Sequence, residues 1–544
     1  MIWTCFILIP CVLNSDPIDR TRPMRTSPTA IKKMRLNMKK NFARSMVSSM
    51  MFGVCLNATG SVCDDKFSKS LFETELDYAS YDFNSHFRRG ERTVLPSFKN
   101  LTNGEAVETG RHSQPVIRGV ADFNLDGLDD LVVTFHETKK VAALLLADGT
   151  GRFKLNWLPK ASESRLFREA SIADFDSDGR PDIYGHTAPH VWKGKNIGGG
   201  GAAEADFLLL NKADGFTAID MSKIVNGNNH QGAVADLDGN GILDVVSLDQ
   251  RSSKGFNSAK KTFLYGQQDG GYRKGPVLPT EFQSSQFFDV EAGDLNGDGA
   301  IDLVFTKEMH HNDISIGSDP LVVIQINGSK GIEKGQTINL SSHWASGSMQ
   351  AEFKNYSNCL KKTEKWGEFK MTKWGAGEIA LFDFDNDGDL DIFFTQHLDL
   401  VHKKKKTWAR GSKLSVLENE YPKFNDVSDS VIPYQPTNKV FTSKGLGRPL
   451  RISFADVNSD GSADLILSGI GAKYQKLEQE HYPYLFIWSN GQYLPVKREQ
   501  MKDLEWRSQL VTGDFNGDGK SDLVSTRYAR KSEQKYVFDT YLSK

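Results

Sequence analysis

The stretch DFNGDGKSDLV occupies residues 514–524 and decides the architecture of the chain. It contains the pattern Asp-x-Asn-x-Asp-Gly-x-x-Asp, followed by residues that favour β-strands. The same nine positions, with Asp or Asn at the third and fifth, occur seven times in the 544 residues. We number these loops 1 to 7 in chain order, and they begin at Asp122, Asp174, Asp236, Asp294, Asp383, Asp456 and Asp514. Seven copies in one chain indicate a repeat architecture rather than coincidence.

The oxygen-bearing residues at positions one, three, five and nine of each loop indicate a site for a hard cation. A tight loop directs alternate side chains toward one point, and the glycine at position six permits a backbone conformation that a Cβ would penalise. Calcium takes about six to eight oxygen ligands, whereas magnesium prefers a strict octahedron and retains its waters. We therefore predict up to seven Ca²⁺ ions. The predicted ligands are Asp122, Asn124, Asp126, Asp130, Asp174, Asp176, Asp178, Asp182, Asp236, Asp238, Asn240, Asp244, Asp294, Asn296, Asp298, Asp302, Asp383, Asp385, Asp387, Asp391, Asp456, Asn458, Asp460, Asp464, Asp514, Asn516, Asp518 and Asp522.

Two other interpretations of the loops were weighed. An Asx turn, in which Asp and Asn bond only to their own backbone, accounts for one Asp and the glycine but not for four polar positions at fixed spacing. An EF-hand needs a Glu at loop position twelve and a helix on each side. Position twelve holds Val133 in loop 1 and Ser525 in loop 7, and strand-like runs follow the loops. The loops are therefore expected to join two strands.

Charge count ranks the predicted calcium sites. Loops 2 and 5 carry four carboxylates each at the ligand positions, and they are expected to bind most strongly. Loop 3 has Asn240 at position five, and Gly239 and Gly241 make its empty turn flexible. We expect loop 3 to bind calcium most weakly.

Hairpin signals follow each loop and predict an all-β fold. Asp148-Gly149 and Asn490-Gly491, for example, lie between apolar runs, and such dipeptides are strong markers of tight hairpins. Each repeat thus reads as a four-stranded antiparallel sheet, and we predict a seven-bladed β-propeller with a calcium loop in each blade. The last repeat lacks a fourth strand, so a segment within 79–98, for instance Arg92–Leu95, is predicted to pair with Tyr536–Leu542 and close the ring.

Residues 514–524 resemble the FG-GAP/VCBS repeat, which is found in integrin α-chain propellers and in many secreted bacterial and fungal proteins. The similarity covers roughly residues 110–544, although the Phe-Gly and Gly-Ala-Pro signatures that name the repeat are mostly absent. The resemblance implies an integrin-α-like calcium-binding β-propeller whose cations hold the blades. Some relatives are lectins, some are adhesion heads and some are non-catalytic domains of polysaccharide lyases. It therefore implies a secreted, calcium-stabilised binding or adhesion module for carbohydrate or an extracellular protein, but fold does not settle function.

The N-terminal region is interpreted as targeting sequence. Basic residues after Met38, an apolar stretch and small residues at 58–60 predict a signal peptide over 38–60. Residues 1–37 are then an upstream mis-assigned start, or part of one long disordered leader. Residues 61–110 form an N-terminal segment with the closing strand, and 111–544 form the propeller. We expect a secreted, periplasmic or cell-surface protein.

Composition narrows the class of partner. A net charge of −2 gives no basic field for nucleic acid. The chain has no apolar run of the roughly 18 residues that a membrane span needs. After cleavage near Gly60, Cys63 and Cys359 remain, and they could pair or stay as free thiols.

A long insertion at about 310–378 is the predicted ligand-binding region. It is rich in aromatic and basic residues, which suit a sugar or an acidic polysaccharide. The candidate ligand-binding residues are His310, His311, Trp344, Trp366 and Trp374. The alternative is that these tryptophans cap the core and that the lysines form a solvated face.

No catalytic motif is present, so enzymatic activity stays uncertain and a purely binding role is favoured. The abundant Asp residues are assigned to cations, which leaves no catalytic carboxylate pair to single out. The second functional hypothesis is a polysaccharide lyase or glycoside-acting enzyme that uses the propeller face, with His310 or His343 as its base.

Overall fold

The chain divides into two compact units, residues 1–65 and 66–544. The computed structural model describes residues 78–95, 115–135, 142–159, 166–188, 191–192, 195–196, 205–225, 229–249, 261–268, 270–275, 287–310, 321–325, 327–328, 331–332, 336–339, 369–402, 408–433, 451–468, 485–501, 504, 509–528 and 536–544. The predicted leader and signal peptide lie outside the described residues, as do Cys63 and Cys359. Within the described residues, no helix is long and apolar enough to cross a membrane.

Four sheets contain four antiparallel strands each, in chain order. The first comprises β3 (Pro115–Ala121), β4 (Asp130–Phe135), β5 (Ala142–Ala147) and β6 (Phe153–Trp157). The second comprises β7 (Leu166–Ala173), β8 (Asp182–Ala188), β11 (Phe207–Lys212) and β12 (Gly215–Asp220). The third comprises β13 (Asn229–Ala235), β14 (Asp244–Asp249), β15 (Lys261–Gly266) and β16 (Tyr272–Lys274). The fourth comprises β27 (Arg451–Ala455), β28 (Asp464–Ser468), β29 (Leu485–Ser489) and β30 (Gln492–Pro495).

Two larger sheets complete the unit. An eight-stranded sheet contains β17 (Phe287–Gly293), β18 (Asp302–His310), β19 (Leu321–Gln325), β22 (Gln336–Asn339), β23 (Phe369–Phe382), β24 (Asp391–His402), β25 (Trp408–Glu420) and β26 (Lys423–Asp426). A five-stranded sheet contains β31 (Gln509–Gly513), β32 (Asp522–Tyr528), β33 (Tyr536–Ser543), β1 (Phe87–Arg89) and β2 (Thr93–Leu95). Short pairs also occur, β9 (Val191–Trp192) with β10 (Lys195–Asn196) and β20 (Asn327–Gly328) with β21 (Gly331–Ile332). The helical turns are α3 (Phe83–His86), α8 (Ser428–Val431) and η6 (Arg498–Met501).

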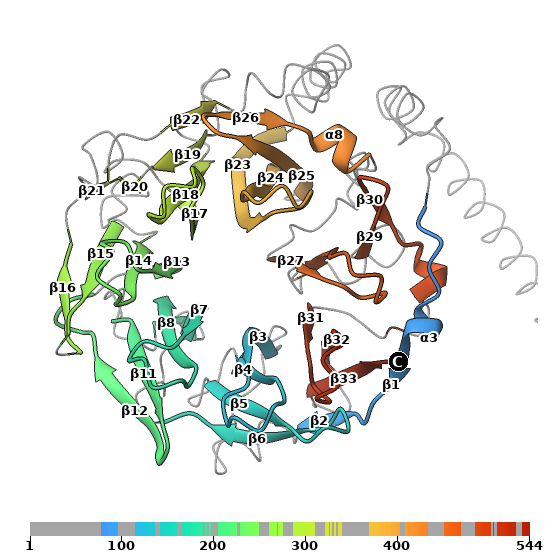
Figure 1. Cartoon of the computed structure of the whole chain (residues 1–544), viewed down its shortest axis with the longest axis horizontal. Coiled ribbons are helices and arrows are strands. Elements are labelled where there is room, and N and C mark those ends of the chain that lie inside the picture. The colour runs from blue at the N-terminus through green and yellow to red at the C-terminus, as the bar shows by residue number, and fades with distance from the viewer. Residues whose placement is uncertain are drawn as a thin grey trace, which may run out of the picture. The chain divides into compact units, whose positions relative to one another are not determined.

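These sheets are arranged around a centre as the blades of a β-propeller (Figure 1). The described strands give six sheets of four or more strands, so the prediction of seven blades is wrong. The fourth and fifth repeats share one sheet because β18 and β23 run on beyond the loop ends and pair there, with Met309 opposite Trp374 and His310 opposite Lys373. The all-β class and the antiparallel four-stranded unit are confirmed.

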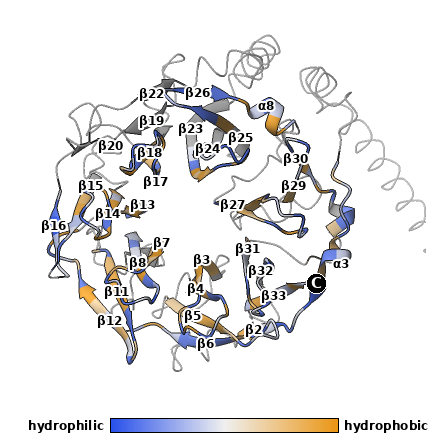
Figure 2. Ribbon diagram, viewed as in Figure 1, coloured by the Kyte–Doolittle hydropathy of each residue, from blue (hydrophilic) through white to orange (hydrophobic). Residues whose placement is uncertain are grey.

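Buried apolar residues are concentrated in the middle strands of the sheets, for example Leu131–Val133 of β4 and Leu465–Leu467 of β28. The outer strands β16 and β26 are mostly hydrophilic, as Figure 2 shows. The residue at loop position two is also buried in every repeat, with 7% exposure or less, and these residues are Phe123, Phe175, Leu237, Leu295, Phe384, Val457 and Phe515. Phe515 meets Phe153 of the first sheet at 5.5 Å between ring centroids. Phe384 meets Trp488 of β29 at 5.8 Å. Each loop therefore anchors one blade, and at these positions it also packs against the next.

The ring closes through the N-terminal segment. β2 pairs with β33, placing Thr93 opposite Phe538 and Leu95 opposite Tyr536. β1 pairs with the end of the same strand. Arg89 donates a 2.9 Å hydrogen bond to the buried carboxylate of Asp539, which Arg92 also contacts. The predicted pairing of this segment with the last strand is confirmed.

Candidate functional site: the acidic loops and the central pocket

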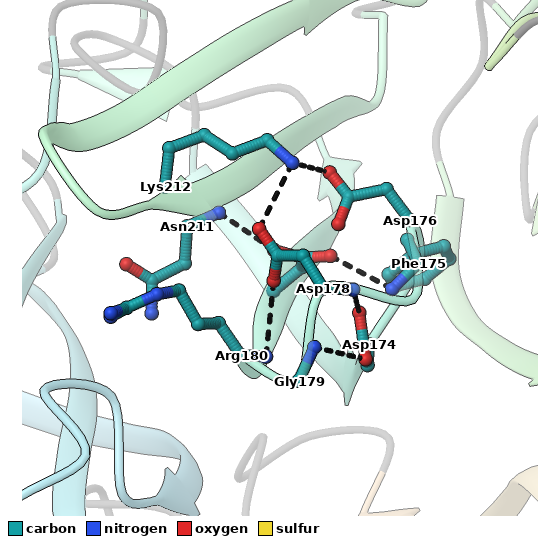
Figure 3. A network of polar contacts seen from close by, with 9 residues as sticks. Asp174, Phe175, Asp176, Asp178, Gly179, Arg180, Asn211 and Lys212 are labelled. Atoms are coloured by element: carbon teal, nitrogen blue, oxygen red, sulfur yellow. Dashed lines mark hydrogen bonds and ion pairs between the residues drawn. The ribbon is translucent and has the colours of Figure 1, made fainter.

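The first Asp of each loop closes the turn on its own backbone. In loop 2, Asp174 accepts hydrogen bonds from the amides of Asp178 at 3.0 Å and Gly179 at 2.8 Å (Figure 3). The glycine at position six has a φ between +77° and +99° in all seven loops, the left-handed region that a side chain would strain. All seven loops have the same pair of hydrogen bonds from positions five and six. Hydrogen bonds within the loop and the glycine at position six therefore define the turn without a cation.

The Asp at position nine is buried, with 1% exposure or less in every loop. Asp182 accepts from the amide of Phe175 at 2.8 Å and from the amide of Asn211, on β11, at 2.6 Å. It thus ties the loop to the third strand of its own sheet. Burial raises the pKa of Asp182 to about 6 and that of Asp391 to about 7. Hydrogen bonds from backbone amides lower both pKa values, but their effect is smaller than that of burial. A nearby positive charge would stabilise these ionised carboxylates.

Position three separates the loops into two kinds. In loops 1, 4, 6 and 7 it is Asn, whose amide donates to the carboxylate at position five at 2.8–3.1 Å. In loops 2, 3 and 5 it is Asp. Among the described residues these three loops gather carboxylate oxygens within 4.8 Å of one another, and the clusters are Asp174, Asp176 and Asp182; Asp236, Asp238 and Asp244; and Asp383, Asp385 and Asp391.

The carboxylates of these three clusters fit a hard cation. Asp176 Oδ1 in loop 2 and Asp389 Oδ1 in loop 5 are buried without a hydrogen-bond partner among the described residues. Neither the Asx turn nor the strand pairing satisfies them. Oxygen donors of this kind suit Ca²⁺ rather than softer metals. The Asx-turn interpretation explains the residues at positions one, five and nine. It does not explain the Asp at position three, which indicates a cation site.

Basic side chains approach two of the three clusters. Lys212 of β11 contacts Asp176 and lies 3.0 Å from Asp178, as Figure 3 shows. Arg273 of β16 lies 3.4 Å from Asp238 in loop 3. Within the described part of the chain, loop 5 has no such ion pair. It also has a fifth carboxylate, Asp389, whose pKa is raised to about 6 by burial and by the neighbouring Asp387. Loop 5 is therefore the most favourable of the three for a cation.

A pocket of about 210 Å³ lies where the first strands of the sheets converge. Its charged lining residues come from five strands: Arg118 on β3, Glu169 on β7, Asp289 and Glu291 on β17, Glu378 on β23 and Arg451 on β27. This cluster was not predicted from the sequence. A signal was available, because Glu169, Asp289, Glu378 and Arg451 each stand five residues before the first Asp of a loop.

The pocket carboxylates are held by backbone and side-chain contacts. Asp289 accepts from the amides of Val290 at 3.0 Å and Ile379 at 2.8 Å. Glu378 accepts from the Gln231 amide at 3.1 Å. Burial, reinforced by the charge of Asp289, raises the pKa of Glu169 to about 8, and Arg451 opposes the shift. Burial likewise raises the pKa of Glu291 well above its ordinary value.

The predicted ligand-binding residues of the insertion are only partly described. His310 ends β18 and Trp374 lies in β23, and the pairing of these strands brings their backbones to neighbouring register positions. His311, Trp344 and Trp366 lie outside the described residues, as does His343. The candidate sugar site in this region stays a prediction.

Comparison with known proteins agrees with the repeat and the sheets. The FG-GAP-like repeat matches at residues 122–185, 236–305 and 456–525. Each match begins at the first Asp of a loop and ends just after the following loop. The chain is thus a β-propeller that contains FG-GAP-like repeats, as the resemblance implied. No curated protein matches the chain.

Solved structures show a weak similarity. The V. cholerae biofilm matrix protein Bap1 is 11% identical, covering 84% of this chain and 91% of its own, with a TM-score of 0.34. An endo-arabinase from Bacteroides thetaiotaomicron is 11% identical, covering 62% of this chain and 99% of its own, with a TM-score of 0.31.

Proposed function

We propose that this protein is a secreted, calcium-stabilised β-propeller that acts as a binding or adhesion module for a carbohydrate or an extracellular protein. The observation that supports calcium is the crowding of carboxylates at position three of loops 2, 3 and 5. The ligand positions of all seven loops are the proposed cation sites, with loop 5 the strongest. The binding role is supported by the charged central pocket and by the absence of any catalytic motif in the sequence.

In loop 5 the proposed ligands are Asp383, Asp385 and Asp391. A bound cation supplies the positive charge that these carboxylates otherwise lack. Phe384 lies between two of them in the chain and packs on Trp488 of the next sheet. Fixing loop 5 therefore fixes a contact between sheets, and calcium should stabilise the ring as well as the loop.

The experiment is a thermal melt in excess chelator, followed by addition of calcium or magnesium. Binding to the folded state alone stabilises it by mass action, so we expect a melting temperature that falls with chelator and recovers better with calcium. An unchanged melt would mean that the loops are Asx turns only. Glycan-array binding then tests the ligand class, and saturable retention supports the binding role.

A second candidate, a polysaccharide lyase or glycoside-acting enzyme, is favoured by the raised pKa of Glu169 near other pocket carboxyl groups. A protonated carboxylic acid beside an ionised carboxylate is the arrangement that glycoside hydrolysis uses. Incubation with a panel of acidic polysaccharides separates the two functions. New reducing or unsaturated ends would replace the binding proposal with the enzymatic one.

A further inference from the structure

The central pocket has more acidic than basic groups. Glu169, Asp289, Glu291 and Glu378 face Arg118 and Arg451, so four carboxyl groups oppose two guanidinium groups. Part of each guanidinium is already engaged by the protein. Arg118 Nε donates to Thr134 Oγ1 at 2.9 Å, and Arg451 Nη2 donates to the carbonyl of Arg118 at 3.4 Å. The arginines can therefore pair with only two of the four carboxyl groups, and burial raises the pKa of Glu169 and Glu291, which favours their protonated forms while the pocket holds no further cation.

One acceptor in the pocket is unused. The Glu169 carboxylate accepts from the Gly232 amide, but its Oε2 is buried and has no hydrogen-bond partner among the described residues. A buried oxygen left in this way destabilises the fold, and more so if it is charged. Side chains of Asp289 and Glu378, in contrast, have partners. Glu169 lines the pocket, and its Oε2 has neither a donor nor an acceptor among the described residues.

We propose that the central pocket binds a small organic cation, a primary ammonium or guanidinium group, with Glu169 Oε2 as its principal acceptor. Such a group supplies N–H donors to Glu169 Oε2, together with a positive charge that takes the place of the proton Glu169 holds without it. The inference gives the proposed binding role a particular site, and it rests on that proposal for its place in the protein's function.

A metal ion and an anion fit the pocket less well. Among the described residues, groups of three carboxylate oxygens within 4.8 Å occur in the loops and not in the pocket, so no divalent-cation site is assembled there. An anion would meet more carboxyl groups than guanidinium groups. A neutral hydroxyl compound could donate to Glu169 but would bring no charge to favour the ionised carboxylate.

The size of the pocket indicates a head group rather than a long ligand. Its volume of about 210 Å³ equals that of roughly seven liquid waters and lies below the range of about 300–1,000 Å³ that is usual for drug-sized ligands. The same chemistry could come from a free small amine or from the end of a lysine or arginine side chain on a larger partner. The probes below distinguish these sources.

Proton linkage gives an independent readout. The charged residues that line the pocket with Glu169 are Asp289, Glu291, Glu378, Arg118 and Arg451. Burial, and to a lesser extent the charge of Asp289, raises the pKa of Glu169 to about 8, so Glu169 is protonated at neutral pH. A cationic ligand favours the ionised form, so binding at pH 7 should release a proton. Affinity should therefore rise between pH 6 and pH 9, as Glu169 ionises.

The experiment is calorimetric titration of the full, calcium-loaded chain with n-butylammonium and with agmatine, using n-butanol as the uncharged match. We expect binding of the cations but not of butanol, with proton release seen as a dependence on buffer ionisation enthalpy. Glu169→Gln should weaken binding about tenfold or more, because a charge-assisted hydrogen bond is lost. Arg451→Met should strengthen it, and Glu91→Gln, an exposed site with the same charge change, should leave it unaltered.

Binding of butanol equal to that of butylammonium, no binding of either cation, or full binding by Glu169→Gln would each overturn the proposal. If Glu169→Gln does not fold, the pH dependence and proton release of the wild type decide the question. Lysine tripeptide against its Nε-acetylated form then separates a tethered source from a free amine. The calcium-dependent melt is measured on the same samples, so a failed pocket and a failed calcium-stabilised propeller give different results.

Discussion

Lys212 Nζ lies 3.0 Å from Asp178 Oδ2 and also contacts Asp176, so an ammonium group reaches into the acidic turn of loop 2. Lys212 stands directly after Asn211, whose amide bonds to Asp182 in the same loop. The hydrogen bond from the Lys212 ammonium lowers the pKa of Asp178. The four carboxylates of loop 2 are thus partly neutralised by the protein itself, which charge count along the sequence does not reveal.

Replacing Lys212 by Met should strengthen calcium binding at loop 2 and weaken the calcium-free fold. The ammonium competes with the ion for Asp176 and Asp178. Removing a unit charge near the site should tighten calcium binding by about tenfold, within the range over which ligand charge tunes such loops. Calcium titration and melts in chelator measure the two effects, and Lys154→Met on exposed β6 is the control. Weaker calcium binding by the variant would show that Lys212 orders the loop for the ion.

Asp385→Ala should cost more calcium-dependent stability than Asp238→Ala. Loop 5 has no ion pair among the described residues, whereas Arg273 lies 3.4 Å from Asp238 in loop 3. Loss of a metal ligand should then differ between the variants by about 1 kcal/mol or more. Denaturation at a calcium level that saturates the wild type makes the comparison. A costlier Asp238→Ala would mean that packing around each loop, not its charge, sets the site.

Asp539→Asn should loosen the closure of the ring. The Asp539 side chain is fully buried and contacts Arg89 and Arg92, which are themselves partly exposed. Because solvent screens these arginines, we expect a loss of about 1–2 kcal/mol rather than the larger cost of breaking a fully buried pair. Denaturant unfolding measures the loss, and the exposed Asp148→Asn is the control. A loss no greater than that of the control would show that strand pairing alone holds β1 and β2.

Stability should fall as pH rises toward 8 because of Glu169. Its pKa is raised in the fold to about 8, from an ordinary value of 4.5. Between these values the folded state holds a proton that the unfolded state has released, so the free energy of unfolding decreases with rising pH and levels off above pH 8. Glu169→Gln removes this term, and its melting temperature should decline less between pH 6 and pH 9, by ~1–3 °C. If the melting temperatures of the two proteins change with pH in parallel, Glu169 is already ionised across this range and the prediction is wrong.

The acidic loops and the closing strand could be predicted from sequence because both depend on local signals. The Asp and Gly pattern specifies a turn by itself, and a missing final strand, inferred from chain length, pointed to the segment around Thr93. The central pocket could not be predicted in this way. Glu169 and Asp289 lie in strands of different sheets, and they converge only when the ring is assembled. The merging of the fourth and fifth repeats was missed for a similar reason, since the β18–β23 pairing depends on how far two strands extend.

The pairing of β2 with β33 also constrains when the protein can fold. Thr93 and Phe538 are partners although almost the whole described chain lies between them, so the ring cannot close until β33 has been synthesised. Sheets that form earlier keep unpaired strand edges, and strand pairs so distant in sequence form slowly. A ring that is still open therefore exposes these strand edges to solvent for longer. Closure of the ring is thus a late step in folding, and it needs β2 and β33 together.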